Sequence, residues 1–210
     1  MRHALTLAAL LIVTTSSAIA ADQPDKFKWT SEKFALVASG NAKTGEEIAA
    51  QNRCKKCHNE DGVSDDAEIP TIAGQRATYL YKQLTDFHIG RREEEDMTKA
   101  AKKLDEQDMI HLAAFYQQQE RPQMVGGDAP LVVKVCDSCH NEEIVEEDNN
   151  IEVAPILKGQ NRQYLENTMQ AFKQRERAND LFVRMQSVTH KLTDQEIKQL
   201  ARYYGTTDPE

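Results

Sequence analysis

The sequence has few cysteines and places all of them in two short motifs. Its four cysteines lie within Cys54–His58 and Cys136–His140, so none is left for a structural disulfide elsewhere. No alternation of apolar and polar residues stands out that would predict β-strands. Beyond the N-terminus the chain also lacks an apolar stretch of about 20 residues, the length needed to cross a bilayer. These absences favour an all-α protein with no integral membrane segment in its mature form.

The N-terminus has the pattern of a cleaved secretory signal. A polar start precedes a compact apolar run from Ala4 to Val13, and small residues end the segment at Ala18-Ile19-Ala20. The apolar run is too short to span a bilayer, and the small-residue ending favours cleavage after Ala20 over an uncleaved anchor. Residues 1–20 are therefore predicted to be a signal peptide, and the mature protein is expected in a bacterial periplasm.

The chain has fewer basic residues than acidic ones. The formal net charge is −8, and the acidic residues are spread over both halves of the chain. Nucleic acid is not an expected partner, because its phosphates would be repelled. The acidic surface suits a protein partner with a basic docking patch, since complementary fields steer encounter. The alternative is that the charge serves solubility alone.

The chain contains one unit written twice. Each Cys motif is followed by the same landmarks in the same order, and the spacing between matched residues widens twice. Two small insertions in the second copy explain the widening, one around residues 142–150 and one around 175–183. The matched landmarks are Pro70 with Pro155, Gly74-Gln75 with Gly159-Gln160, Tyr79-Leu80 with Tyr164-Leu165, Phe87 with Phe172, Leu104 with Leu192, Leu112-Ala113 with Leu200-Ala201, and Phe115-Tyr116 with Tyr203-Tyr204.

Each unit is predicted to be mainly helical. A short helix should lead into each Cys motif, at Thr44–Asn52 behind a Thr44 cap and at Asp128–Val135. Another helix should follow each Gly-Gln landmark. Apolar stripes at helical spacing predict the last helix of each unit at Asp105–Gln118 and Thr193–Tyr204.

These elements predict two tandem domains, at residues 41–118 and 127–210. The linker at 119–126 is short, so the two domains are expected to pack together. Residues 21–40 form an N-terminal extension that has no twin in the repeat. This extension either drapes over the first domain or stays partly disordered.

The two Cys-x-x-Cys-His motifs predict two covalently bound haems. In such a motif the two thiols add to the vinyl groups of haem, and the adjacent histidine supplies one axial ligand to the iron. A zinc site or two disulfides would not require a histidine directly after the second cysteine, so these alternatives are disfavoured. A buried haem would also enlarge the core of units that are small on their own. The predicted attachment residues are Cys54, Cys57 and His58, and Cys136, Cys139 and His140.

The repeat also selects candidates for the second axial ligand. Met97 and Met185 are the methionines that keep register, each at the same distance before a matched leucine. A thioether ligand raises the reduction potential, which suits an electron carrier. The loop position expected for both residues argues against ordinary packing. The other methionines are assigned to the core or the linker, and three histidines without a twin are weaker rivals: Met109, Met169, Met124, His88, His111 and His190.

With these motifs in place, nearly the whole mature chain resembles the dihaem cytochrome c4 family. The resemblance implies two class I cytochrome c domains related by a pseudo-twofold axis, His/Met ligation at both irons, and haem propionates near the domain interface. It also implies that the Pro70 and Pro155 carbonyls accept the proximal histidine proton. Two departures are Asn59 and Asn141, where glycine commonly follows the motif, and a third is the acidic run at residues 93–96.

The resulting prediction is a periplasmic electron carrier of a respiratory chain, and not an enzyme, because both axial positions of each iron would be filled. Its partners would be a terminal oxidase or other redox proteins. The same plan is similar to the cytochrome subunit of flavocytochrome c sulfide dehydrogenase, so the alternative is a subunit that receives electrons from a flavoprotein. A haem enzyme or gas sensor would require that Met97 or Met185 not bind iron.

Overall fold

The computed structural model describes residues 27–140 and 153–206. The predicted signal peptide and the predicted insertion at 142–150 lie outside these residues. The described chain is helical, with one isolated bridge between Gln160 and Gly205 in place of any strand. The elements in chain order are α1 (Ser31–Ala38), α2 (Ala42–Gln51), α3 (Lys55–His58), α4 (Ala77–His88), α5 (Glu95–Ala101), α6 (Glu106–Gln117), α7 (Val133–His140), α8 (Arg162–Lys173), the 3₁₀ turn η1 (Leu181–Val183), α9 (Arg184–Thr189) and α10 (Asp194–Tyr204).

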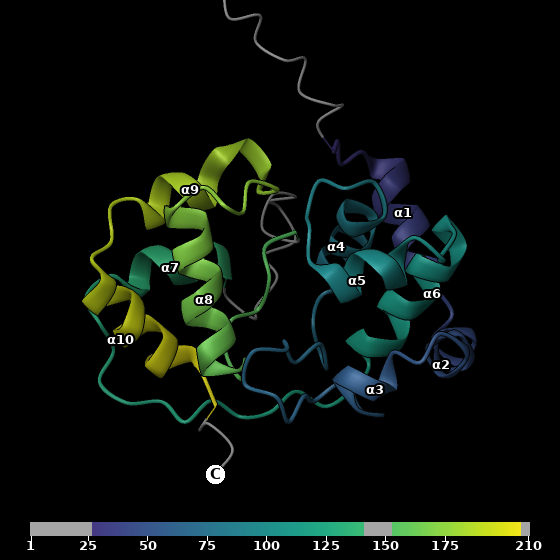
Figure 1. The fold of residues 1–210 in the computed structure, drawn as a ribbon, viewed down its shortest axis with the longest axis horizontal. Coiled ribbons are helices and arrows are strands. Elements are labelled where there is room, and N and C mark those ends of the chain that lie inside the picture. The colour runs from purple at the N-terminus through teal and green to yellow at the C-terminus, as the bar shows by residue number, and fades with distance from the viewer. Residues whose placement is uncertain (1–26, 141–152, 207–210) are drawn as a thin grey trace, which may run out of the picture.

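Figure 1 shows these helices as two groups side by side, which we call the first lobe (α1–α6) and the second lobe (α7–α10). In the first lobe α6 packs against α1, α2 and α4, and α5 packs against α4. In the second lobe α8 packs against α9 and α10. The all-α fold predicted from the sequence is confirmed. No helix within the described ranges is long and apolar enough to cross a membrane.

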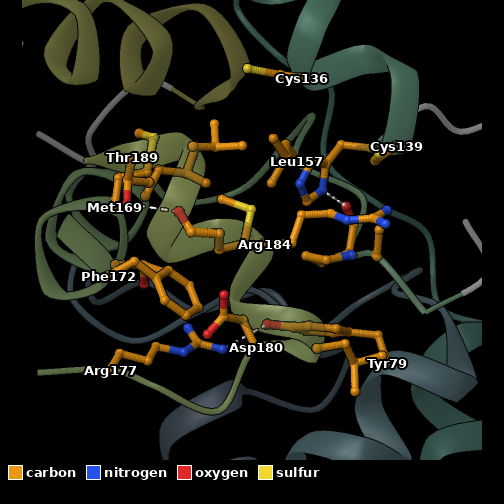
Figure 2. A pocket seen from close by; sticks show the side chains of 18 of the residues that line it. Tyr79, Cys136, Cys139, Leu157, Met169, Phe172, Arg177, Asp180, Arg184 and Thr189 are labelled. Carbon is orange, nitrogen blue, oxygen red and sulfur yellow. Dashed lines mark hydrogen bonds between the residues drawn. The ribbon is translucent and has the colours of Figure 1, made fainter. Parts of the chain in front are cut away.

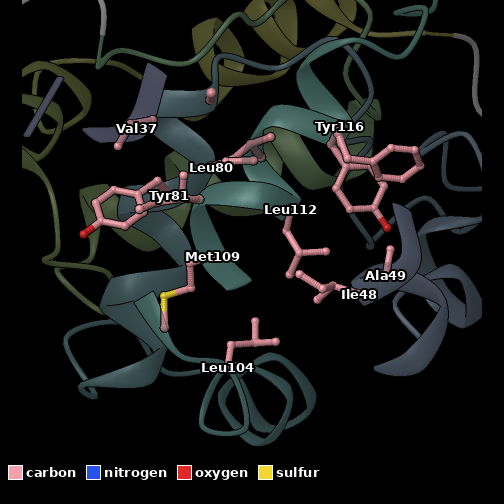
Figure 3. Close-up of a cluster of buried hydrophobic side chains, with 13 residues drawn as sticks. Val37, Ile48, Ala49, Leu80, Tyr81, Leu104, Met109, Leu112 and Tyr116 are labelled. Atoms are coloured by element: carbon pink, nitrogen blue, oxygen red, sulfur yellow. The ribbon is translucent and has the colours of Figure 1, made fainter. Parts of the chain in front are cut away.

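The first lobe has the larger apolar core. Figure 3 shows it gathered around α6, with Leu112 beside Ile48 and Met109 towards Leu104. Gly45 lies where α2 meets α6, and a Cβ at this position would come within 2.0 Å of the His111 carbonyl oxygen. The close approach of the two helices therefore requires glycine at this position. The second lobe has a smaller core, made of Val133, Leu165, Leu200, Ala201 and Tyr204.

The part of the N-terminal extension that the structure describes is packed on the first lobe. Helix α1 buries Val37, and the Trp29 ring stacks on Phe34 with centroids 4.6 Å apart. Lys33 binds Glu106 of α6 through an Nζ–Oε1 contact of 2.8 Å. Residues 27–38 therefore drape over the first lobe, which is one of the two possibilities that the sequence left open.

The starts of helices α2 and α7 differ from those predicted. Helix α2 is capped by Asn41, whose Oδ1 accepts from the Thr44 amide at 3.0 Å, so the predicted Thr44 cap is wrong. Both residue types are good caps, and asparagine ranks above threonine at this position. Helix α7 begins at Val133 rather than Asp128 and runs through the Cys motif. The last helix of each lobe lies within one residue of its prediction, behind capping boxes at Asp105 and Thr193.

Candidate haem sites

Each Cys motif ends in a buried histidine that is held by a proline carbonyl. His58 Nδ1 lies 3.0 Å from the Pro70 oxygen, and His140 Nδ1 lies 2.7 Å from the Pro155 oxygen. A carbonyl oxygen only accepts, so Nδ1 carries the proton and Nε2 keeps a free lone pair. Burial lowers the pKa of both imidazoles because it disfavours the charged form. Each ring is thus held neutral and oriented, with Nε2 available to a metal, and the two expected proline contacts are confirmed.

Asn59 follows the first motif in a backbone conformation that favours glycine. Its φ is 56° and its ψ is 178°, a region that residues with a Cβ rarely adopt. The Asn59 amide donates to the Val63 oxygen at 2.8 Å and to Asp65 Oδ2 at 2.9 Å. These two bonds hold the turn at Asn59, the position where the family resemblance implied a glycine.

In the second lobe the predicted site residues surround one cavity. Cys136, Cys139, His140 and Met185 all line it, and it is partly open to solvent. Most of the remaining walls are apolar, as expected for the site of a large hydrophobic ring. Figure 2 shows Cys136, Cys139, Leu157 and Met169 around this space. The apolar wall residues include Leu157, Leu165, Met169, Phe172, Leu192 and Leu200.

Met97 and Met185 lie in helices and not in the loops expected for them. Met97 is in the first turn of α5, and Met185 is in the first turn of α9; both side chains are half-buried. Glu94 caps α5, since its carboxylate accepts from the Met97 amide at 2.8 Å. The unusual acidic run thereby gains a local role, because carboxylates stabilise a helix N-terminus. The structure brings Met185 to the cavity of His140, whereas it places Met97 on α5 against α4.

None of the three rival histidines lines the second-lobe cavity that the described residues form. His88 Nδ1 lies 3.0 Å from the Ala101 oxygen, and His111 Nδ1 accepts from the Asn41 amide at 3.0 Å. His190 is exposed at the end of α9. Met109 is buried in the first core, as the sequence predicts, while Met169 both packs on the second core and lines the cavity.

A symmetric pair of arginines between the lobes was missed by the sequence analysis. Arg92 donates to the Tyr164 hydroxyl at 3.0 Å, and Arg177 donates to the Tyr79 hydroxyl at 3.3 Å. Both also donate to the Gln83 amide oxygen. Each guanidinium stacks on a phenylalanine of its own lobe, 4.6 Å from the Phe87 ring or 4.5 Å from the Phe172 ring. Arg92 and Arg177 have the same spacing along the chain as the matched tyrosines and phenylalanines of the repeat, so this spacing could have identified them as a pair.

Three cationic groups, those of Lys82, Arg92 and Arg177, lie close together at the lobe interface. Burial raises the pKa of Tyr164, but Arg92 and Arg177 outweigh it and lower that pKa to about 7. Arg177 lines the cavity and its buried Nη1 has no hydrogen-bond partner among the described residues. Figure 2 shows Arg177 against Phe172, with Tyr79 reaching in from α4. An apolar cavity edged by a guanidinium fits haem, whose ring is apolar and whose propionates are anionic.

Comparisons with known proteins agree with this geometry. A family model described as "Cytochrome c" matches residues 42–120. Cytochrome c4 of Pseudomonas aeruginosa is 31% identical over 183 residues, covering 79% of this chain and 88% of that protein. The crystal structure of reduced recombinant cytochrome c4 from Pseudomonas stutzeri superposes with a TM-score of 0.67 and 28% identity, over 79% of this chain and 98% of that one. A "Thiosulfate dehydrogenase electron acceptor" of Stutzerimonas stutzeri is 28% identical, covering 72% of this chain and 77% of that protein.

Proposed function

Because the chain belongs to the cytochrome c4 family, we propose that it is a periplasmic dihaem c-type cytochrome, which carries electrons between redox partners of a respiratory chain. One haem c is held in each lobe. Cys54 and Cys57 attach the first, and Cys136 and Cys139 attach the second. A bound c-type haem supplies one-electron exchange between ferric and ferrous iron.

We assign His58 with Met97, and His140 with Met185, as the residues that would hold the two irons. The observation that carries the proposal is the second-lobe cavity, where both cysteines, the oriented histidine and Met185 share one space. The repeat extends the assignment to the first lobe, since His58 has the same proline contact as His140.

The chain's own groups prepare these sites for electron transfer. The proline carbonyls fix the ring plane of each histidine and raise its basicity as a ligand. The apolar wall excludes water, and Arg177 offers a buried donor to an anionic group at the cavity edge. A site with two protein ligands leaves no open position for a substrate, so we propose no enzymatic reaction at either iron.

The test is the haem content and redox behaviour of the full chain, matured in a periplasm. We expect mass spectrometry to show two haems on each chain with the signal peptide removed after Ala20. Potentiometric titration should then show two reversible one-electron steps. One haem per chain, or stoichiometric carbon monoxide binding to the reduced protein at neutral pH, would contradict the assignment.

A second candidate is a cytochrome that serves a sulfur-oxidising enzyme, either as its free acceptor or as a subunit of a flavocytochrome complex. The likeness to a thiosulfate dehydrogenase electron acceptor favours it. Rapid reduction of the protein by a thiosulfate-oxidising enzyme, faster than its reduction by respiratory donors, would support this role. Co-purification with a flavoprotein would identify the subunit form, and recovery of the monomer alone would count against it.

A further inference from the structure

The peptide bond between Pro70 and Thr71 is hydrogen-bonded at both ends, to residues of different lobes. Its carbonyl, from Pro70, lies 3.0 Å from His58 Nδ1. Its amide, from Thr71, donates to Gln160 Oε1 at 2.8 Å. Gln160 belongs to the second lobe and is only 5% exposed. Its Nε2 completes the contact by donating to the Thr71 carbonyl at 2.8 Å.

The second lobe has the mirror arrangement. The peptide bond between Pro155 and Ile156 accepts from His140 through its carbonyl at 2.7 Å. Its amide donates to Gln75 Oε1 at 2.9 Å, and Gln75 Nε2 donates to the Ile156 carbonyl at 3.0 Å. Gln75 is a residue of the first lobe and is 2% exposed. The two contacts are therefore related by the same repeat that relates the two Cys motifs.

Hydrogen bonds in such a chain strengthen one another. A peptide whose N–H donates to a good acceptor places more negative charge on its carbonyl oxygen, which makes that oxygen a better acceptor. A better acceptor at Nδ1 makes the imidazole a stronger electron donor to a bound metal. Stronger donation stabilises the ferric state over the ferrous state. The glutamine of one lobe is thus connected to the proximal ligand of the other through one peptide bond.

We propose that Gln75 and Gln160 are crossed positioning residues: Gln160 tunes the haem at His58, and Gln75 tunes the haem at His140. The inference rests on the proposed function, since it requires both histidines to bind iron. Each glutamine side chain contacts only the backbone N–H and C=O of its partner residue. The two contacts are therefore the same although the side chains of Thr71 and Ile156 differ. Closure of the interface thereby sets the redox properties of both haems at once.

The test measures each haem's reduction potential in Gln160→Ala and Gln75→Ala variants of the full, haem-loaded chain. We expect Gln160→Ala to favour reduction of the His58 haem about threefold, or about 28 mV at 59 mV per tenfold for one electron. The His140 haem should stay unchanged, and Gln75→Ala should show the reverse. The Thr71 amide should lose its downfield proton shift in Gln160→Ala.

Two further variants separate tuning from loosened packing. Gln160→Glu keeps an acceptor for the Thr71 amide, so the His58 haem should not become easier to reduce. Gln163→Ala on α8, whose amide binds Asn167 near the surface at 2.7 Å, should move neither potential. Equal shifts of both haems, a shift confined to the variant's own lobe, or no shift would overturn the proposal. A wild-type chain with fewer than two haems would instead show that the proposed function has failed.

Discussion

Arg92 and Tyr164 join the two lobes through a hydrogen bond of 3.0 Å between Nη2 and the phenol oxygen. Tyr164→Phe removes the acceptor of Arg92 Nη2 and leaves that half-buried N–H unpaired, while Nη1 keeps its bond to Gln83. This loss should cost about 1–3 kcal/mol of unfolding free energy. Urea unfolding followed by circular dichroism measures this loss. Tyr203→Phe removes a hydroxyl from the half-buried residue next to Tyr204 on α10 and is the control, with an expected change below about 0.5 kcal/mol. An equal loss in the two variants would contradict a specific role for the interface bond.

The sequence predicted the features that depend on local order along the chain. The last helices were placed by their apolar stripes, and the structure adds capping boxes at Asp105 and Thr193 that were not predicted. The His–Pro contacts were expected from the family resemblance. The pairing of the two Cys motifs followed from the repeat.

Local sequence patterns did not predict the interface between the lobes. Lys82 and Asp86 on α4 are 4% and 0% exposed, although a helix with this sequence alone would keep them in water. Lys82 is buried because its Nζ binds the Asn179 carbonyl of the second lobe at 2.6 Å as well as Asp86. The burial of this charge depends on a partner about a hundred residues away in the sequence. Helical periodicity gives no information about such a distant contact.

Met185→Ala should remove the sulfur-to-iron charge-transfer absorption of one haem and let carbon monoxide bind that haem in the reduced state. The reason is that the variant opens the sixth position at the iron bound by His140. Met169 lines the same cavity and packs on the second core, so Met169→Ala is a matched control. It should cost about 0.5–3 kcal/mol of stability, since Met169 is only partly buried, while the absorption persists. Loss of the absorption in Met169→Ala, with Met185→Ala unaffected, would reverse the ligand assignment.

Met97→Ala should have the same spectroscopic effect on the other haem. Here the control is Met109→Ala, because Met109 is 4% exposed in the first core and lies 3.8 Å from the Thr85 hydroxyl through its sulfur. The double variant Met97→Ala/Met185→Ala should lose the absorption completely. Retention of half the signal in the double variant would show that another residue binds one iron.

Glu94→Ala should loosen Met97 without touching it. The Glu94 carboxylate accepts from the amides of Asp96 and Met97, and removal of such a cap costs about 0.5–2 kcal/mol. The first turn of α5 then frays, and carbon monoxide should bind the reduced His58 haem faster than in the wild type. Glu93→Ala removes the same charge from the neighbouring exposed position and should leave the rate unchanged. Equal rates in the two variants would show that charge, and not the cap, controls access.

Glu106 links the N-terminal extension to the first lobe in a pH-dependent way. Hydrogen bonds from Lys33 and Tyr81 lower the pKa of its carboxyl below the ordinary value of 4.5. A lowered carboxyl pKa contributes stability that is present above the unfolded pKa and is lost as the pH falls through the folded one. Because the side chain of Glu106 is 53% exposed, solvent screens the pair and the contribution is about 0.5 kcal/mol.

Glu106→Gln should therefore be less stable than the wild type at pH 7 and equal to it well below pH 4.5, as measured by unfolding across this range. Glu47→Gln on α2 removes the same formal charge from an exposed site and serves as the control for net charge. The extension contact is refuted as the cause if the two variants show the same pH profile.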